Sequence, residues 1–286
     1  MTVDPGQAGR DRRDLAHALK SLRIASGLSG ERLAVRCGMS QSKVSRIETG
    51  RTLPTAMDVQ LMLNALGIDD ETAEDLVGLA QRANTEYEDV RTWARRGLHT
   101  VQQELNSLET KATRLRYFLP GIPTGLLQTS EYMRVAMSPS VDPVKVDDSR
   151  TIALKTRRQA VLHDASKRFE FLLTESALRW RLAPPGVMAL QLDRIASLSR
   201  LPSVWIGVLP LSRTIPEIPF HTFTIYDRDL LTIEVFSGRI ALRDPKDIDY
   251  YNALFNFFQQ HAESGASARR LLQGWADEFR AEAGGE

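Results

Sequence analysis

Small polar and basic side chains are concentrated between residues 40 and 52. The segment that begins at Ser40 and ends at Arg46 reads SQSKVSR, in which Val44 alone is apolar. A Gln amide can pair with adenine through two hydrogen bonds, and Lys or Arg can donate to guanine or to phosphate oxygen atoms. These residue types at this spacing indicate a surface that contacts DNA.

Within this segment, Gln41 is expected to read base edges, because the first residues of a recognition helix reach the floor of the major groove. Lys43 and Arg46 can reach guanine or phosphate, whereas Ser42 and Ser45 are small enough to permit close approach. A solvated polar helix face is the alternative interpretation of these positions. The candidate DNA-contacting residues are Ser29, Ser40, Gln41, Ser42, Lys43, Ser45, Arg46, Arg51 and Thr52.

The charge distribution also favours a polyanionic partner. The formal net charge of the chain is +1, but residues 10–67 hold ten basic and five acidic residues. Residues 68–90 then hold eight acidic residues against Arg82. A basic segment before an acidic one fits a nucleic-acid-binding domain, with ordinary solvated faces as the alternative. Arg51 and Thr52 are expected to contact phosphate groups, which position a protein without reading sequence.

Five short helices are predicted between residue 11 and about residue 82, and they would position the polar segment. The first has one apolar face, because its aliphatic residues recur at helical spacing: Leu15, Ala18, Leu19 and Leu22. Three hydroxyl side chains are expected to cap the next three helices, namely Ser29, Ser40 and Thr55. Glycines are expected to end the first four helices, namely Gly27, Gly38, Gly50 and Gly67. The acidic Asp69-Asp70-Glu71 suits the start of the fifth helix.

The stretch LRIASGLSGERLAVRCGMSQSKVSRIETGRTLP, residues 22–54, resembles the helix-turn-helix of lambda-repressor-like regulators of the xenobiotic-response-element type. The resemblance implies a five-helix domain that binds double-stranded operator DNA. It also implies that Arg23 and Glu48 form a partly buried ion pair between the first and third helices. Gly30 departs from the pattern, because many relatives have a polar residue at that position.

Residues 84–116 contain no Pro and are predicted to form one long helix. Apolar residues follow alternating steps of four and three from Ala94 to Leu115, which is a heptad seam over about three repeats. The seam indicates either packing within its own domain or a dimer contact. Further helices are expected over residues 128–137 and 143–163.

Strands are predicted where branched and aromatic residues gather, at RFEFLLT (168–174) and SVWIGVLPL (203–211), with a helix between them. FHTFTIY (220–226) and LLTIEVF (230–236) flank three residues, the length of a hairpin loop. Two helices close the chain. The predicted architecture is an all-α, five-helix, lambda-repressor-like DNA-binding domain (residues 1–83) followed by an α+β domain (residues 84–286) with a small mixed or antiparallel sheet covered by helices.

The stretch LETKATRLRYFLPGIPTGLLQTSEYMR, residues 108–134, resembles the signature of a C-terminal domain attached to helix-turn-helix regulators that are numerous in actinomycetes. FEFLLTESALR, further along, agrees with it. Thr124 stands where relatives usually have Pro directly before the GLLQT motif. The resemblance implies a role in development and antibiotic production, often with a small partner protein, and some members are described as antitoxin-like.

No pattern of catalytic residues accompanies these motifs. The five histidines lack metal-ligand spacing, and no GxSxG elbow or glycine-rich phosphate loop occurs. We therefore expect no enzyme activity, no metal and no cofactor. The lone Cys37 excludes an internal disulfide bond. No apolar run approaches the ~18 residues of a membrane span, and the first residues lack a secretory signal, so a cytoplasmic, nucleoid-associated location is expected.

The C-terminal domain is expected to form a homodimer and to receive a signal. The heptad seam, the strand at 203–211 and the helix with Trp275 and Phe279 are the candidate contact areas. A pocket for a small-molecule effector or a small cognate protein has four candidate residues, Arg116, Gln128, Tyr132 and Glu234, which local packing explains equally well. The main function hypothesis is a dimeric sequence-specific transcriptional regulator. Its alternatives are an antitoxin-like protein-interaction module that autoregulates its operon and an enzyme fused to a DNA anchor.

Overall fold

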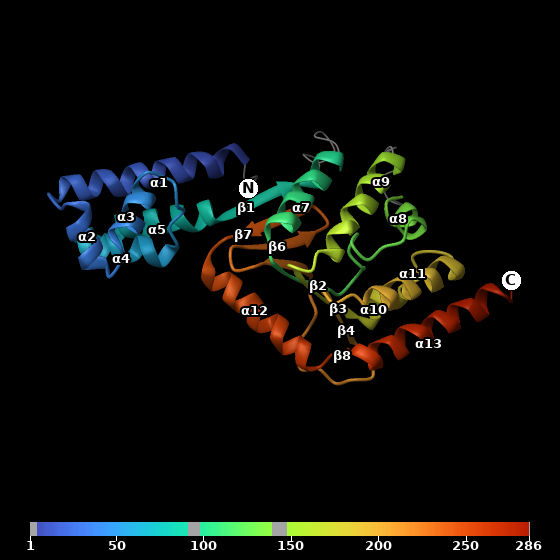
Figure 1. Cartoon of the computed structure of the whole chain (residues 1–286). Helices are drawn as coiled ribbons and strands as arrows, with labels where there is room; N and C mark the ends of the chain where they lie inside the picture. Colours follow the sequence, from blue (N-terminus) through green and yellow to red (C-terminus); the bar gives the residue numbers. More distant parts are fainter. Residues whose placement is uncertain (1–4, 91–97, 139–147, 286) are drawn as a thin grey trace. The chain divides into compact units, whose positions relative to one another are not determined.

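The computed structural model describes residues 5–90, 98–138 and 148–285. The chain divides into two compact units (Figure 1). The N-terminal unit comprises residues 1–89 and 238–248, and the C-terminal unit comprises residues 90–237 and 249–286. The N-terminal unit is therefore discontinuous in sequence. That residues 1–83 act as a domain by themselves stays a prediction.

The helical part of the N-terminal unit has the predicted five helices. They are α1 (Pro5–Ala25), α2 (Gly30–Cys37), α3 (Gln41–Glu48), α4 (Ala56–Leu66) and α5 (Asp70–Asn84). Helix α1 begins earlier than predicted. The predicted caps are present: the Ser29, Ser40 and Thr55 hydroxyls each accept a hydrogen bond from a backbone N–H three residues later. Because these signals are local, the sequence predicted the starts of α2, α3 and α4 correctly.

Aliphatic side chains from α1 to α4 form the core of this cluster. The fully buried members are Leu15, Leu19, Leu33, Val44, Ile47, Val59, Met62 and Leu63. Burial of each such side chain contributes roughly 1.5–3 kcal/mol. Val44 and Ile47 are the inward side of α3, so this packing turns the opposite side of α3 outward.

A two-stranded ribbon completes the N-terminal unit. Strand β1 (Thr85–Asp89) pairs antiparallel with β7 (Gly238–Leu242). Glu88 of β1 forms an ion pair with Arg239 of β7, and Glu86 of β1 forms one with Arg243, the residue directly after β7. A Cβ added at Gly238 would lie 2.0 Å from the Glu88 carbonyl oxygen, so this position requires glycine. Part of the acidic stretch at 68–90 is thus neutralised within the unit.

The predicted long helix over residues 84–116 is wrong. The segment contains β1, α7 (Leu98–Lys111) and β2 (Arg114–Leu119). Ala94 lies outside the described residues, and Leu115 belongs to β2, so the heptad seam is not one helical stripe. The first four residues of RLRYFL in β2 alternate between charged and apolar side chains, as in a strand, and the last three are all apolar. Hydrogen bonding to strands on both sides decides its conformation.

The C-terminal unit contains a mixed sheet, as predicted. Its other strands are β3 (Arg168–Thr174), β4 (Val204–Leu209), β5 (Thr222–Tyr226), β6 (Leu230–Val235) and β8 (Glu263–Ser264). Within the unit the strand order is β6-β5-β2-β3-β4-β8. Strands β2, β3 and β4 are parallel, and the other pairs are antiparallel. The hairpin between β5 and β6 was predicted, whereas β1, β2, β7 and β8 were missed.

Helices cover both faces of this sheet. Tyr117 on β2 donates a hydrogen bond to Glu109 on α7, and the next residue, Phe118, stacks on Phe258 of α12 (Pro245–Gln260). Neighbouring side chains on a strand point to opposite faces. Helices α7 and α12 therefore lie on opposite sides of β2. The remaining helices are α8 (Ser130–Ala136), α9 (Asp148–Arg158), α10 (Glu175–Arg179), α11 (Pro185–Leu198) and α13 (Gly265–Ala283).

Two other sequence expectations need correction. The helix predicted over residues 143–163 consists of α9 and a 3₁₀ turn, η1 (Gln159–His163), and residues 143–147 lie outside the described part. The areas expected to hold a dimer contact are largely internal: β4 lies between β3 and β8, and Trp275 and Phe279 are buried on α13. No helix in the described part of the chain has the length and apolar character needed to cross a membrane.

Candidate nucleic-acid interface

The outward side of α3 carries most of the predicted DNA-contacting residues. Gln41, Ser42, Ser45 and Arg46 are exposed, whereas Val44 and Ile47 are buried. Burial of the two aliphatic residues fixes the rotation of the helix. The arrangement presents an amide, two small hydroxyls and a guanidinium together, and these are groups that can bond to base edges and phosphates.

Ser29 and Ser40 have a local structural task at the starts of α2 and α3. Each hydroxyl accepts a hydrogen bond of 3.2 Å, from the N–H of Arg32 and of Lys43 respectively. Both serines are exposed. A hydroxyl that accepts a backbone N–H still has its own hydrogen to donate, so capping is compatible with a phosphate contact.

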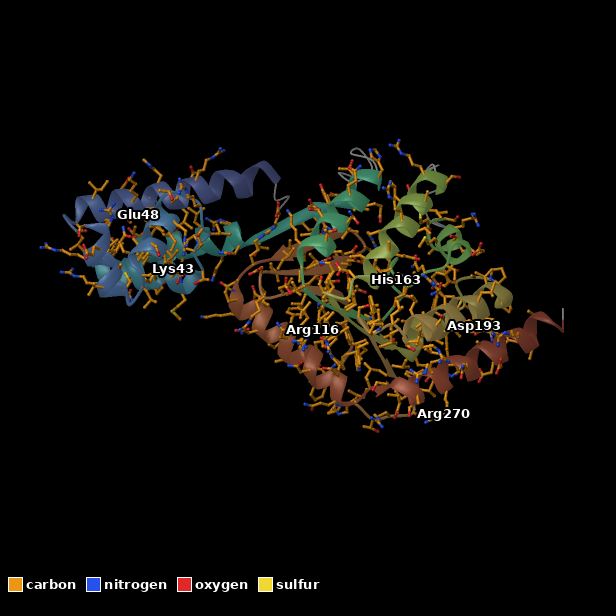
Figure 2. The ribbon with its side chains drawn as sticks, viewed as in Figure 1. Lys43, Glu48, Arg116, His163, Asp193 and Arg270 are labelled. Carbon is orange, nitrogen blue, oxygen red and sulfur yellow. The ribbon has the colours of Figure 1, made fainter. Side chains whose placement is uncertain are left out.

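Lys43 is more restrained than its neighbours on α3. Its Nζ lies 2.7 Å from Oδ1 of Asp58, and the Lys43 side chain is 38% exposed (Figure 2). Asp58 also forms a capping box with Thr55 at the start of α4. Lys43 therefore joins α3 to α4, which the sequence interpretation did not foresee. A phosphate contact by Lys43 would have to share or replace this ion pair.

Arg23 and Glu48 form the ion pair that the resemblance implied, between α1 and α3. Arg23 Nε lies 2.6 Å from Glu48 Oε1, and Arg23 Nη2 lies 2.9 Å from Oε2. Arg23 Nη1 donates to the carbonyl oxygen of Leu28 at 2.9 Å. Hydrogen bonding to Glu48 raises the pKa of Arg23. This two-pronged contact holds the C-terminal end of α3 (Glu48 is labelled in Figure 2).

Arg51 and Thr52 lie in a tight turn after α3. Gly50 has a left-handed backbone, with φ 67°, which favours glycine. The backbone N–H groups of Arg51 and Thr52 both donate to the carbonyl oxygen of Arg46, at 2.8 and 3.1 Å. The turn thus keeps Arg51, which is exposed, beside the end of α3. Gly30 is a different case, since a Cβ there would meet nothing within 4 Å; packing does not explain the departure from the family pattern.

The four residues proposed to line one effector pocket are not brought together. Gln128 is buried, and its Nε2 donates to the carbonyl oxygen of Pro123 at 2.7 Å. Tyr132 is buried in α8, and burial raises its pKa to about 12. Glu234 is exposed on β6. The cavity that Arg116 lines includes none of these three, so it gives no support to a single pocket shared by all four residues.

Arg116 instead belongs to a cluster on β2 and β3 (Figure 2). Its Nε donates to Glu170 at 2.8 Å, its Nη1 donates to Asn252 at 2.7 Å, and its guanidinium lies 5.0 Å from the Phe255 ring centre. A cavity of about 470 Å³ adjoins it, lined by Arg114, Arg116, Ile225, Asp227, Arg228, Asp249, Asn252 and Asn256. Of the charged side chains that line this cavity, Arg228 pairs with Asp249, whereas Arg114 and Arg116 pair with Glu170, outside the lining.

Glu170 is the centre of that cluster and was missed from the sequence. It is 1% exposed and accepts hydrogen bonds from Arg114, Arg116 and Arg168. Burial alone would raise the pKa of Glu170, but the hydrogen bonds and charges of these arginines outweigh it and lower the pKa. The position of Glu170 between two Phe residues, in RFEFLLT, was the sequence signal that could have indicated a buried carboxylate. A charge on a buried strand requires partners.

Two buried glutamines hold the GLLQT loop, and neither was predicted. Gln191 on α11 accepts from the N–H of Thr129 at 2.8 Å and donates to the Leu127 carbonyl at 2.9 Å. Gln159 donates to the carbonyls of Gly125 and Gln128. The loop's irregular backbone thus finds partners in distant side chains, which explains much of this motif by structure alone.

Two family models match different parts of the chain. A helix-turn-helix domain model matches residues 14–76, and such a domain is typical of DNA-binding regulators. No curated protein matches the chain significantly. Among solved structures, a phospholipase D family member, Nuc from Salmonella typhimurium, has 9% identity and a TM-score of 0.34, covering 57% of this chain and 90% of that one. TrmBL2, an archaeal chromatin protein, has 13% identity and a TM-score of 0.32, and the match covers 78% of this chain and 69% of that one. These TM-scores are too low to carry an argument.

The second family match covers most of the C-terminal unit. The model described as a domain of unknown function (DUF5753) matches residues 102–274, more than half of the chain. The matched part contains the GLLQT loop, Glu170 and Gln191. The chain therefore belongs to the DUF5753 family, with a helix-turn-helix domain in front of the family domain.

Proposed function

We propose that the protein is a sequence-specific DNA-binding transcriptional regulator whose α3 enters the major groove of its operator. The outward face of α3 carries the proposal: its polar residues are exposed while Val44 and Ile47 are buried. Exposed basic residues of the same unit would face the phosphates, namely Arg13, Lys20, Arg32, Arg36, Arg46 and Arg51. Phosphate contacts would orient the domain, and α3 would supply the base contacts.

Selection of operator DNA tests the proposal. The full-length protein would be used to enrich binding sites from fragments of its own genome, and affinity would then be measured on the enriched site and on a scrambled duplex. A specific regulator should prefer the enriched site by at least about a thousandfold at physiological salt. Failure to enrich any site, or equal affinity for both duplexes, would contradict the proposal.

The proposed regulator is a homodimer whose main contact lies in the C-terminal unit. One helix-turn-helix covers one half-site, and two-fold symmetric dimers place two such helices on neighbouring turns of DNA. Exposed apolar side chains in the C-terminal unit support this arrangement. Three of them belong to the segment after β4: Leu211, Ile218 and Phe220 are 72%, 62% and 77% exposed. Contiguous exposed apolar patches mark interaction surfaces, and these three residues lie within one short segment.

The proposal assigns no chemical reaction and no cofactor to the protein. A regulator that binds chromosomal DNA would act in the cytoplasm, associated with the nucleoid. Its C-terminal unit would receive the regulatory signal. The alternative function, an antitoxin-like module that binds a small cognate protein, stays a prediction.

A further inference from the structure

A cavity of about 480 Å³, with polar and apolar side chains in its lining, lies beside α7, α9 and η1 in the C-terminal unit. Its lining consists of Gln102, Gln103, Asn106, Thr110, Leu154, Arg157, Arg158, Ala160 and Val161. Among the described residues that line it, two are basic and none is acidic. The amide and hydroxyl groups come from α7, and the two guanidinium groups come from the end of α9. Its volume is in the range of small-molecule sites.

Arg158 is held rigidly at the base of this cavity. The side chain is 5% exposed, and its Nε lies 3.1 Å from Glu109 Oε2 without hydrogen-bond geometry. Its Nη1 donates to Gln102 at 2.7 Å. A Cβ at Gly125 would lie 3.2 Å from Nη2. The glycine of the GLLQT motif therefore leaves room for the guanidinium, which is positioned before any ligand arrives.

We propose that this cavity binds a small organic anion, whose carboxylate or phosphate group is held by Arg157 and Arg158. A guanidinium presents several N–H donors in a plane, which suits an oxyanion. Gln103, Asn106 and Thr110 would bond to the other polar groups of the ligand. The inference does not depend on DNA binding, because every contact lies within the C-terminal unit.

Glu109 couples this site to pH. The carboxyl is 2% exposed, and burial raises its pKa to about 7, against the opposing charge of Arg158 and a hydrogen bond from Tyr117. Tyr226 interacts electrostatically with Tyr117, and the Lys167 ammonium bonds to the backbone at the end of α7. Protonation of Glu109 leaves Arg158 without its counterion. An anion should then bind more tightly, and its binding should in turn raise the pKa of Glu109.

Calorimetric titration of the full-length protein with sulfate and with tartrate tests the proposal. Both probes keep their charge between about pH 6 and pH 8, and they separate phosphate-like from carboxylate recognition. At least one should bind, with an affinity up to about tenfold higher at the lower pH. Binding near neutral pH should take up protons, seen as a dependence of the heat on the buffer. Glu109→Gln should keep the binding and abolish its pH dependence.

Variants on α9 locate the binding. Arg157→Gln should weaken the probe about fivefold, and Arg158→Lys should weaken it about tenfold or more, since lysine keeps the charge but not the planar donor set. Arg150→Gln is the matched control, because Arg150 is an exposed residue of the same helix that does not line the cavity. It should leave the affinity unchanged. Circular dichroism would check that each variant folds.

Two results would overturn the inference. One is the absence of binding by either probe at concentrations on the order of tens of millimolar, a level at which even very weak sites fill. The other is an equal effect of Arg157→Gln and Arg150→Gln, or no effect of Arg158→Lys in a folded protein. The second result would mean that the heat comes from general attraction to basic residues rather than from this cavity.

Discussion

At the scale of single residues, Gln41 is the position from which base recognition is expected. It is the first residue of α3 and is exposed. Gln41→Ala should cost about 1–3 kcal/mol on the enriched operator and much less on scrambled DNA. Gln81→Ala, which removes an exposed amide from α5, is the control and should change neither affinity. An equal loss on both duplexes would reassign Gln41 to the DNA backbone.

Arg51 has a different expected role, because its turn places it after α3 rather than on the helix face. Arg51→Ala should weaken binding to all sequences and lower the slope of log K against log salt by about 1. Titrations by fluorescence anisotropy at several salt concentrations would measure this slope. A relaxed preference at one operator position, with an unchanged slope, would instead mean that Arg51 reads a base.

The Arg23–Glu48 pair should affect folding more than DNA chemistry. Their side chains are only 14% and 8% exposed. Arg23→Met leaves the Glu48 carboxylate without its partner and should lower the free energy of unfolding by about 3 kcal/mol. Replacing both residues by Met should cost less than this single change. Urea unfolding measures both values, and a double variant that is less stable than Arg23→Met would refute the argument.

At the scale of elements, local signals predicted the helical cluster and failed where partners are distant in sequence. Caps such as Ser40 and Thr55 act within three residues, so they can be recognised directly. The residues after Leu108 fit both the heptad pattern of a helix and the alternating pattern of a strand, and the sequence alone could not decide between a helix and a strand. Pairing of β2 with β3 and β5 decides it. Those partners lie far along the chain.

The candidate DNA interface was predictable for the same reason, because all its residues lie in one short segment. The polar interior of the C-terminal unit was not. Glu109 and Arg158 meet only when α7 and α9 pack together, and neither has a local pattern that marks it as buried. Gln128 and Tyr132 were correctly seen as part of a motif, and the structure shows that buried glutamines hold this motif's loop.

The junction of α7 and α9 should make folding stability depend on pH. The pKa of the Glu109 carboxyl is about 7 in the folded protein, against 4.5 ordinarily. The folding stability that Glu109 contributes is therefore fully present below pH 4.5 and is lost as the pH rises through 7. The loss should be about 3 kcal/mol. Urea unfolding at several pH values from about 4.5 to 8 should show this decline in the native sequence.

Glu109→Gln should remove that decline, whereas Glu131→Gln, at an exposed position on α8, should preserve it. Glu170 does not interfere, because its pKa is lowered and its contribution is lost only as pH falls below the ordinary range of a carboxyl. A decline of the same size in the Glu109→Gln protein would show that another group controls this pH range.

At the scale of the whole molecule, the DNA-binding unit cannot be separated by a simple cut. Strand β7 and the following residues, up to Ile248, belong to the N-terminal unit although they come late in the chain. A cut after residue 83 would also remove Asn84, whose amide donates to the carbonyls of Pro54 and Ala80 at 2.8 and 2.9 Å. Experiments on assembly therefore need the full-length protein.

Dimerisation through the segment after β4 is the prediction that belongs to this scale. Ile218→Asp combined with Phe220→Asp places two charges on the exposed apolar segment without touching the core. Sedimentation should then give a monomer where the native protein gives a dimer, and affinity for a two-half-site operator should fall about a hundredfold. Affinity for one half-site should not change. The N-terminal unit also exposes an apolar residue, Val35, which is 77% exposed on α2. Val35→Asp is therefore the matched comparison, and dissociation by this change alone would move the dimer contact to the DNA-binding unit.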